Sequence, residues 1–201
     1  MRYLLLSLLF VVSFFGMTQE DLNYVIKGRL SNLDNGGNEG GVSVTLLRNG
    51  TKVASTSTSS NGKYALNAAG PKDGNYEIVY SKPGMVTKKI AFDGSKLNEE
   101  DLPAGNEILF PALDIDLFAE RDNVDFSFLD YEYVASFFWN EKKMVLDFDR
   151  VASEKVRKKI DDLLLKAEKD AAQNEINYNK AIQEADALAG QEKYEDAVMK
   201  Y

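Results

Sequence analysis

The chain of 201 residues contains no cysteine and no histidine. It therefore cannot form a disulfide, has no thiol nucleophile and lacks the side chain that most often serves as a general base near neutral pH. The usual zinc ligand sets are excluded for the same reason. An enzyme of this composition would have to rely on serine, aspartate, glutamate, lysine or tyrosine. Because no G-x-S-x-G motif occurs either, we expect no catalytic residues, no metal and no cofactor.

Positive charge is scarce, with 24 Lys and Arg against 32 Asp and Glu and a formal net charge of -8. Residues 20–149 carry 13 basic and 21 acidic residues, whereas residues 150–201 carry 10 and 11. Binding to nucleic acid or to anionic lipid depends on attraction to phosphates, so this balance argues against both partners. An apolar content of 44% is sufficient for a folded core.

The N-terminal residues have the order of a secretory signal. Arg2 precedes a twelve-residue apolar run from Leu4 to Phe15, which is followed by Gly16-Met17-Thr18. A membrane anchor needs about 20 apolar residues, and this run is shorter. No cysteine follows the run, which excludes a lipoprotein anchor. We predict a signal peptide over residues 1–18, export to the periplasm or cell surface of a Gram-negative bacterium, and no transmembrane helix after cleavage.

The stretch from Gly40 to Asn67 has the strongest β pattern in the chain. Alternating runs are hinged on Asn49-Gly50 and Asn61-Gly62, and Asn-Gly suits the positive φ angles of tight hairpins. The pattern predicts a three-stranded antiparallel meander. Period-two alternation places Val42, Val44 and Leu46 on one face and Ser43, Thr45 and Leu47 on the other.

Four more segments alternate in the same way. They are Tyr24 to Leu30, Tyr76 to Tyr80, Val86 to Phe92, and a final strand from Leu109 to Phe118. Seven strands over about 95 residues predict a sandwich of two antiparallel sheets, and residues 31–41 are expected to cross between the sheets.

The motifs of this region resemble the carboxypeptidase regulatory-like domain. The resemblance rests on Gly28, on G-G-V-S-V-T-L-L, on T-S-S-N-G-K-Y from Thr58 to Tyr64, and on G-N-Y-E-I-V-Y-S-K-P-G-M-V from Gly74 to Val86. It covers about residues 23–92. It implies a transthyretin-like, seven-stranded sandwich over residues 20–120 that acts as an accessory or adhesion-like module. Some structural relatives of that family bind sugars.

Residues 121–149 form an aromatic connector. Tyr131 to Trp139 and Met144 to Phe148 are predicted to form a β-hairpin. The aromatic rings are either a platform for sugars or a layer buried between the sandwich and the following helix, and burial is favoured. The connector and the strand before it also resemble the region that joins such sandwiches to helical repeats in exported envelope proteins of Gram-negative bacteria. Tyr131, Tyr133 and Trp139 are candidate partner or glycan contacts.

Carboxylates are frequent around this connector. Glu120 to Asp125 supply oxygens of the kind that calcium prefers, but their spacing matches no known calcium loop. A solvated rim of the sandwich has the same composition, and we prefer that interpretation.

Residues 150–201 change to a helical period. One apolar stripe runs from Ala152 to Ala171 and another from Tyr178 to Leu188, and Ser153 is a candidate N-cap. Ala185 to Tyr201 resembles the junction of the two helices in a tetratricopeptide (TPR) repeat, which implies Tyr194 and Tyr201 as core or contact residues. A second helix this short cannot bury its face, so we expect this chain to be the N-terminal piece of a longer protein.

Together these patterns predict an α+β protein: a seven-stranded sandwich, a hairpin connector and a TPR-like helical segment. The favoured function is a non-catalytic exported protein of the cell envelope that binds another protein through its helical arm. The alternative is a carbohydrate-binding accessory module, and a hydrolase is the least supported of the three.

Overall fold

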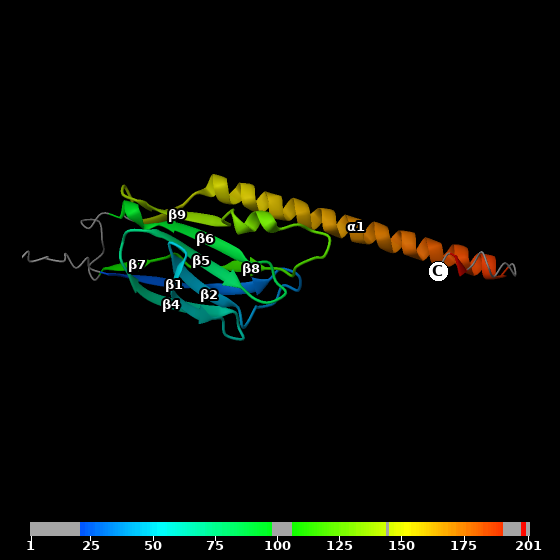
Figure 1. Cartoon of the computed structure of the whole chain (residues 1–201), viewed down its shortest axis with the longest axis horizontal. Coiled ribbons are helices and arrows are strands. Elements are labelled where there is room, and N and C mark those ends of the chain that lie inside the picture. The colour runs from blue at the N-terminus through cyan, green and yellow to red at the C-terminus, as the bar shows by residue number, and fades with distance from the viewer. Residues whose placement is uncertain (1–20, 98–105, 144, 191–197, 200–201) are drawn as a thin grey trace, which may run out of the picture.

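The computed structural model describes residues 21–97, 106–143, 145–190 and 198–199 (Figure 1). These residues form two β-sheets packed as a sandwich and one long helix that lies beside the second sheet and continues past its end. The predicted signal peptide lies outside the described residues, as do Tyr194 and Tyr201. None of the described helices has the length and apolar content needed to cross a membrane.

The first sheet is built around strand β1 (Leu22–Asn32). Strand β4 (Lys63–Gly70) pairs with one edge of β1 in antiparallel orientation. Strands β7 (Glu107–Leu109) and β8 (Ile115–Leu117) pair in parallel with β1, at residues 23–25 and 30–32 respectively.

The second sheet has six strands in the order β10-β9-β6-β5-β2-β3. Only the β6–β9 pair is parallel among the pairs described for this sheet. The strands are β2 (Ser43–Arg48), β3 (Thr51–Ser57), β5 (Asn75–Ser81), β6 (Lys88–Asp93), β9 (Ala135–Asn140) and β10 (Val145–Phe148).

The main core lies between the two sheets because each strand turns alternate side chains inward. Val42, Val44 and Leu46 are buried as predicted. A second, smaller cluster lies between the sandwich and the long helix and contains Val86, Phe118, Leu129, Val156, Ile160 and Leu164. The most deeply buried side chains of the main core include Tyr24, Tyr76, Tyr80, Phe92, Ile26, Leu30, Ile78 and Ile90.

The predicted three-stranded meander is wrong in its third strand. Asn49 and Gly50 both have positive φ (49° and 76°), and they connect β2 and β3 in the expected hairpin. In the second Asn-Gly pair only Gly62 has positive φ, at 74°. The chain therefore leaves the sheet here: the Gly62 carbonyl accepts a hydrogen bond from the Leu30 amide at 2.9 Å, and β4 pairs with β1. The loop over residues 31–41 does cross between the sheets, as predicted.

The predicted count of seven strands is also wrong, because the described residues contain ten. The expected strand from Leu109 to Phe118 is divided into β7 and β8, and Pro111 lies in the gap, where its missing N–H cannot continue the ladder. The Leu113 carbonyl oxygen passes so close to Gly28 that a Cβ there would lie 2.0 Å from it. The connector hairpin is confirmed as β9 and β10, but it belongs to the second sheet, because β9 pairs with β6.

Helix α1 (Arg150–Gly190) is a single helix of 41 residues, about 60 Å long at 1.5 Å per residue. Asp149 caps it, because its Oδ1 accepts a hydrogen bond from the Ala152 amide at 3.0 Å. Ser153 is therefore not the N-cap; its hydroxyl donates to the Asp149 carbonyl at 2.7 Å. The predicted TPR junction from Ala185 to Tyr201 lies largely outside the described residues.

Candidate functional site

The three described aromatic candidates do not form one platform. Trp139 is 7% exposed and belongs to the main core, whereas Tyr131 is 83% exposed. Tyr133 is half-buried with the Lys89 ammonium 5.5 Å from its ring centre, and burial raises the pKa of its hydroxyl. A sugar-stacking surface would need adjacent exposed rings, so this arrangement weakens the glycan interpretation.

Three of the other connector aromatics contribute to the two cores. Phe137 packs in the main core, and Phe126 and Phe128 pack partly buried against the cluster under α1. The indole N–H of Trp139 is buried and has no hydrogen-bond partner among the described residues, which costs free energy in an apolar core. Burial thus holds for only part of this set: Phe137 and Trp139 are buried inside the sandwich, whereas Phe138 and Phe148, like Tyr131, are exposed.

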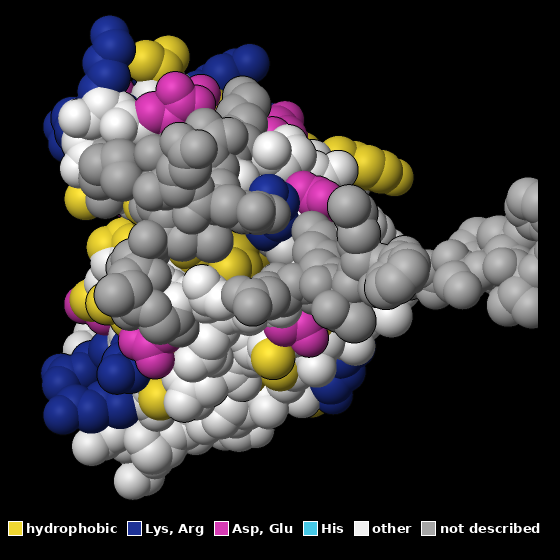
Figure 2. All heavy atoms as spheres, turned by 90° about the vertical axis from the view of Figure 1, so that its left-hand side faces the viewer, with side chains coloured by type: hydrophobic (Ala, Val, Ile, Leu, Met, Phe, Trp, Pro, Cys, Tyr) yellow, Lys and Arg dark blue, Asp and Glu magenta, His cyan; other side chains and the backbone are white. Residues whose placement is uncertain are grey.

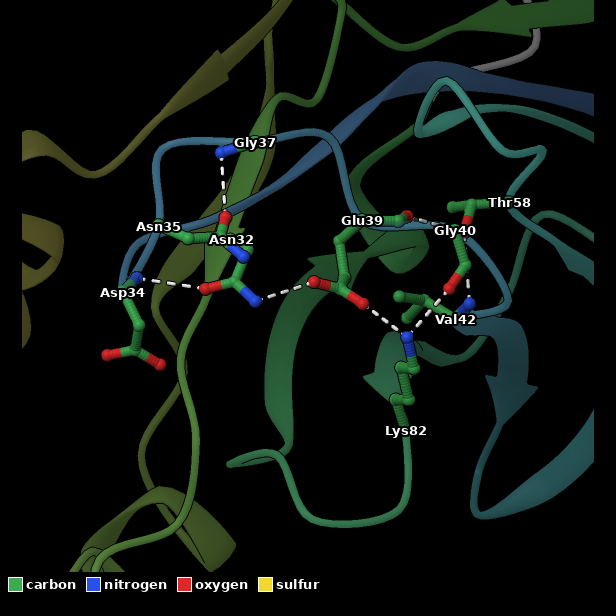
Figure 3. Close-up of polar contacts among 9 residues, drawn as sticks. All are labelled: Asn32, Asp34, Asn35, Gly37, Glu39, Gly40, Val42, Thr58 and Lys82. Atoms are coloured by element: carbon green, nitrogen blue, oxygen red, sulfur yellow. Dashed lines mark hydrogen bonds and ion pairs between the residues drawn. The ribbon is translucent and has the colours of Figure 1, made fainter.

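The crossover loop is held by a polar network (Figure 3). Glu39 is 8% exposed, and its carboxylate accepts hydrogen bonds from the Lys82 ammonium and, at 2.7 Å, from the Asn32 amide. The hydrogen bond from Lys82 is the main reason that the pKa of Glu39 lies below its ordinary value. Lys82 also donates to the Gly40 carbonyl at 2.9 Å.

Thr58 completes this network from the end of β3. Its hydroxyl donates to the Glu39 carbonyl at 2.8 Å and accepts from the Val42 amide at 2.9 Å (Figure 3). The polar groups of the loop bond to one another, so the network is suited to fixing the crossover rather than to binding a ligand.

Two carboxylates in the region of residue 120, Asp34 and Asp125, are bound by groups of their own chain. Arg121 pairs with Asp34 at 3.0 Å, and Asp34 also accepts from the Ala119 amide at 2.7 Å. Asp125 accepts from the Ser127 amide at 2.8 Å, and this hydrogen bond lowers the pKa of its carboxyl. Within the described ranges, no group of three or more acidic residues is placed to hold a metal ion. Calcium binding at Glu120 to Asp125 therefore gains no support.

A serine and a lysine with S-x-x-K spacing, Ser60 and Lys63, lie around the turn that leads into β4. Residues three apart meet on a helix, but these two are exposed and not helical. They form no recognisable nucleophile site.

The joint between sandwich and helix contains a buried lysine. Lys88 is 9% exposed, and its ammonium donates to the Asp116 carbonyl and lies 4.8 Å from the ring centre of Phe118. Burial is the main cause that lowers the pKa of Lys88 to about 8. Lys88 lines a cavity of about 270 Å³ together with Asp116, Arg157 and Asp161.

Sequence reasoning missed Lys88, although a signal for it was present. Lys88, Ile90 and Phe92 alternate along β6, so the lysine occupies an inward position. A charged residue on the apolar side of a strand is rare enough to justify attention.

The outer part of α1, from Glu168 to Lys180, has no supporting surface among the described residues. Every residue from Glu168 to Lys180 is exposed, and the sandwich ends before this segment (Figure 1). Leu165, Ile176 and Tyr178 are 50%, 61% and 65% exposed. The predicted apolar stripe thus continues from the buried Ile160 and Leu164 into a segment that nothing in the described structure covers.

The end of the sandwich opposite the outer part of α1 has a mixed surface. Where described side chains are visible on that face, hydrophobic, basic and acidic groups are interspersed (Figure 2). That visible surface therefore offers no dominant charge to a partner.

No protein-family model and no curated protein sequence matches this chain. Among solved structures, 3-chlorocatechol 1,2-dioxygenase from Rhodococcus opacus 1CP is 9% identical, with a TM-score of 0.34 over 52% of this chain and 62% of the dioxygenase. The 5-hydroxyisourate hydrolase of Klebsiella pneumoniae is 18% identical, with a TM-score of 0.32 over 50% of this chain and 92% of the hydrolase.

Catechol 1,2-dioxygenase from Acinetobacter sp. ADP1 is 14% identical, with a TM-score of 0.33 over 55% of this chain and 57% of the dioxygenase. The match thus spans less than two thirds of the length of either dioxygenase. At these values the likeness carries no argument about activity. The β-sandwich rests on the strand pairing of this chain itself.

Proposed function

We propose that this chain is a non-catalytic, exported interaction protein of the Gram-negative cell envelope, in which a transthyretin-like, carboxypeptidase regulatory-like sandwich supports a helical arm that binds another protein. The observation that supports the proposal is the outer part of α1, which is exposed from Glu168 to Lys180. An isolated helix of this length is marginal in water, so a partner that covers it would stabilise it.

Helix α1 is attached to the sandwich at its first turns, which suits this role. Its first turns are fixed to the sandwich by Val156, Ile160 and Leu164. A helix fixed at one end positions its outer side chains at a defined distance from the body. The arm would therefore present Tyr178, which continues the stripe of Ile160 and Leu164, to a partner in a defined orientation, and further helices of a TPR-like array would enlarge that surface.

Export is supported by the N-terminal pattern, in which Arg2 and the apolar run to Phe15 precede a polar segment. The absence of cysteine does not conflict with export, because the main core is extensive enough to stabilise the sandwich without disulfides.

Site-specific photo-crosslinking in intact cells tests the arm. A photoreactive amino acid at Ile176 or Tyr178 should give adducts with the same partner, identified by mass spectrometry. Leu109, on β7, is the matched control because it is 62% exposed and Ile176 is 61% exposed. Adducts from Leu109 alone, or equal adducts from all three positions, would contradict binding through the arm. Fractionation of the same cells tests export.

The carbohydrate alternative has its own experiment. Tyr131 is the most exposed of the three described candidate rings, so a glycan that binds this face should lose binding in Tyr131→Ala. We expect no such glycan on an array. Clear binding that Tyr131→Ala abolishes would favour a carbohydrate-binding module over protein binding.

A further inference from the structure

The cavity at the joint combines an apolar wall with groups of both charges. Leu33, Ile115, Val134, Ala135 and Ile160 form the apolar part. Lys88, Asp114, Asp116, Arg157 and Asp161 form the charged part. Its volume of about 270 Å³ compares with about 30 Å³ for one water molecule in the liquid, so it has room for a small organic molecule.

The Lys88 amine has the chemistry of a nucleophile. Burial lowers its pKa to about 8, while Asp116 and Asp161 favour its charged form and Arg157 opposes it. A pKa of about 8 leaves roughly a tenth of the amine neutral at pH 7 and half of it neutral at pH 8. The neutral form carries the lone pair that attacks a carbonyl carbon.

The charged groups around Lys88 could bind a carbonyl compound that carries a carboxylate and assist its reaction with the amine. Arg157 is 83% exposed and approaches Asp161 only to 4.0 Å, so its guanidinium can bind a ligand carboxylate at the cavity wall. Asp116 and Asp161 line the same cavity. The Asp116 carboxylate already accepts a hydrogen bond from the Ser31 hydroxyl, so Asp161 is the carboxylate we assign to proton transfer during addition and loss of water.

We propose that Lys88 captures small carbonyl compounds that bear a carboxylate, namely 2-oxo acids or short aldehyde acids, as a reversible imine in this cavity, with Arg157 holding the carboxylate. The amine nitrogen adds to the carbonyl carbon, and a proton moves from nitrogen to oxygen to give a carbinolamine. The C–O bond then breaks, the oxygen leaves as water with the second nitrogen proton, and the C=N bond forms. No electrons are gained or lost overall.

Reductive trapping tests the proposal on the exported chain without any substitution at Lys88. The protein is incubated with glyoxylate and cyanoborohydride at pH 7 to 9, and labelled lysines are mapped by peptide mass spectrometry. Lys27 and Lys142, which are exposed, serve as internal controls. We expect Lys88 to be labelled about tenfold faster than either control near pH 8, because a depressed pKa supplies more neutral amine. Labelling of Lys88 no faster than Lys27 and Lys142 would overturn the proposal.

A second comparison tests the role of Arg157. In Arg157→Gln, labelling of Lys88 by glyoxylate should fall about fivefold, whereas labelling by propanal, which has no carboxylate, should not change. Arg150→Gln is the matched control, because Arg150 does not line this cavity. Equal effects of Arg157→Gln on both aldehydes would show that Arg157 does not hold the carboxylate, and circular dichroism establishes that each variant is folded. Neither outcome depends on protein binding by the arm.

Discussion

The two parts of helix α1 belong to one continuous helix and have opposite environments. In the inner part, Val156, Ile160 and Leu164 are 5–7% exposed against Phe118 and Leu129. In the outer part, Ile176 and Tyr178 are more than 60% exposed. The sequence pattern defines a helix and its apolar stripe, but the rest of the fold supplies the surface that covers the stripe. The sandwich covers the inner part and leaves Glu168 to Lys180 exposed, whereas Ala185, further along α1, is buried again.

The largest effect expected from this contrast concerns equivalent substitutions in the two parts. Ile160→Ala removes a buried side chain and leaves a cavity, so it should lower the free energy of unfolding by about 2 to 5 kcal/mol. Ile176→Ala on the exposed part should change it by less than about 0.5 kcal/mol. Urea denaturation followed by tryptophan fluorescence measures both. Similar losses in the two variants would show that the outer part is packed.

Lys88, between the sandwich and the inner part of α1, should also make the stability of the fold depend on pH. The folded pKa of Lys88, about 8, lies below the unfolded value of 10.5, so between these values the unfolded state binds more protons and stability rises with pH. Between these two pH values Lys88 should raise the free energy of unfolding by roughly 3 kcal/mol. Below about pH 8 it should leave the pH dependence of stability unchanged.

Lys88→Met isolates this contribution, because other groups that titrate in the same window are common to both proteins. The difference in unfolding free energy between the wild type and Lys88→Met should therefore move in favour of the wild type from pH 7.5 to 10. A constant difference across this range would mean that Lys88 titrates alike in the folded and unfolded states.

The start of the inner part has a smaller but separate contribution. Asp149→Ala removes the acceptor for the Ala152 amide and should cost about 1 kcal/mol, whereas Asp149→Asn keeps an acceptor and should cost much less. Thermal unfolding of the two variants measures the difference. If both lose the same amount, the charge of Asp149 near the helix N-terminus matters more than its hydrogen bond.

Local sequence rules predicted the parts of the fold that local geometry decides. The β2–β3 hairpin follows from Asn49-Gly50, because both residues adopt the positive φ that this pair tolerates. The same rule failed at Asn61-Gly62. There the Ser59 hydroxyl donates to the Asn61 side chain at 2.7 Å, and the turn leads the chain towards β1. The same dipeptide thus forms a hairpin between β2 and β3 in one place and a connection between the two sheets in the other. The second outcome depends on the pairing of β4 with β1, which is distant in the sequence.

The features that sequence reasoning did not predict depend on contacts between distant residues. The β6–β9 pairing joins Ile90 to Ala135 and could not be read from either segment alone. The cavity around Lys88 needs β6, β8 and α1 together. Of the candidate contacts, Trp139 could have been placed inside from its period-two spacing with Phe137, because both side chains lie on the same face of β9.

The smallest expected effect gives the sharpest comparison between the two parts of α1. Ala172→Gly in the outer part should cost about 1 kcal/mol of local helix stability, because glycine gains more backbone freedom when the helix opens. Global unfolding should not change, since no core contact depends on Ala172, which is exposed. Hydrogen exchange should therefore accelerate at amides near residue 172 while amides near Ile160 keep their protection. A matching acceleration near Ile160 would mean that α1 opens as one cooperative unit, and the fixed inner part could then not hold the arm in position.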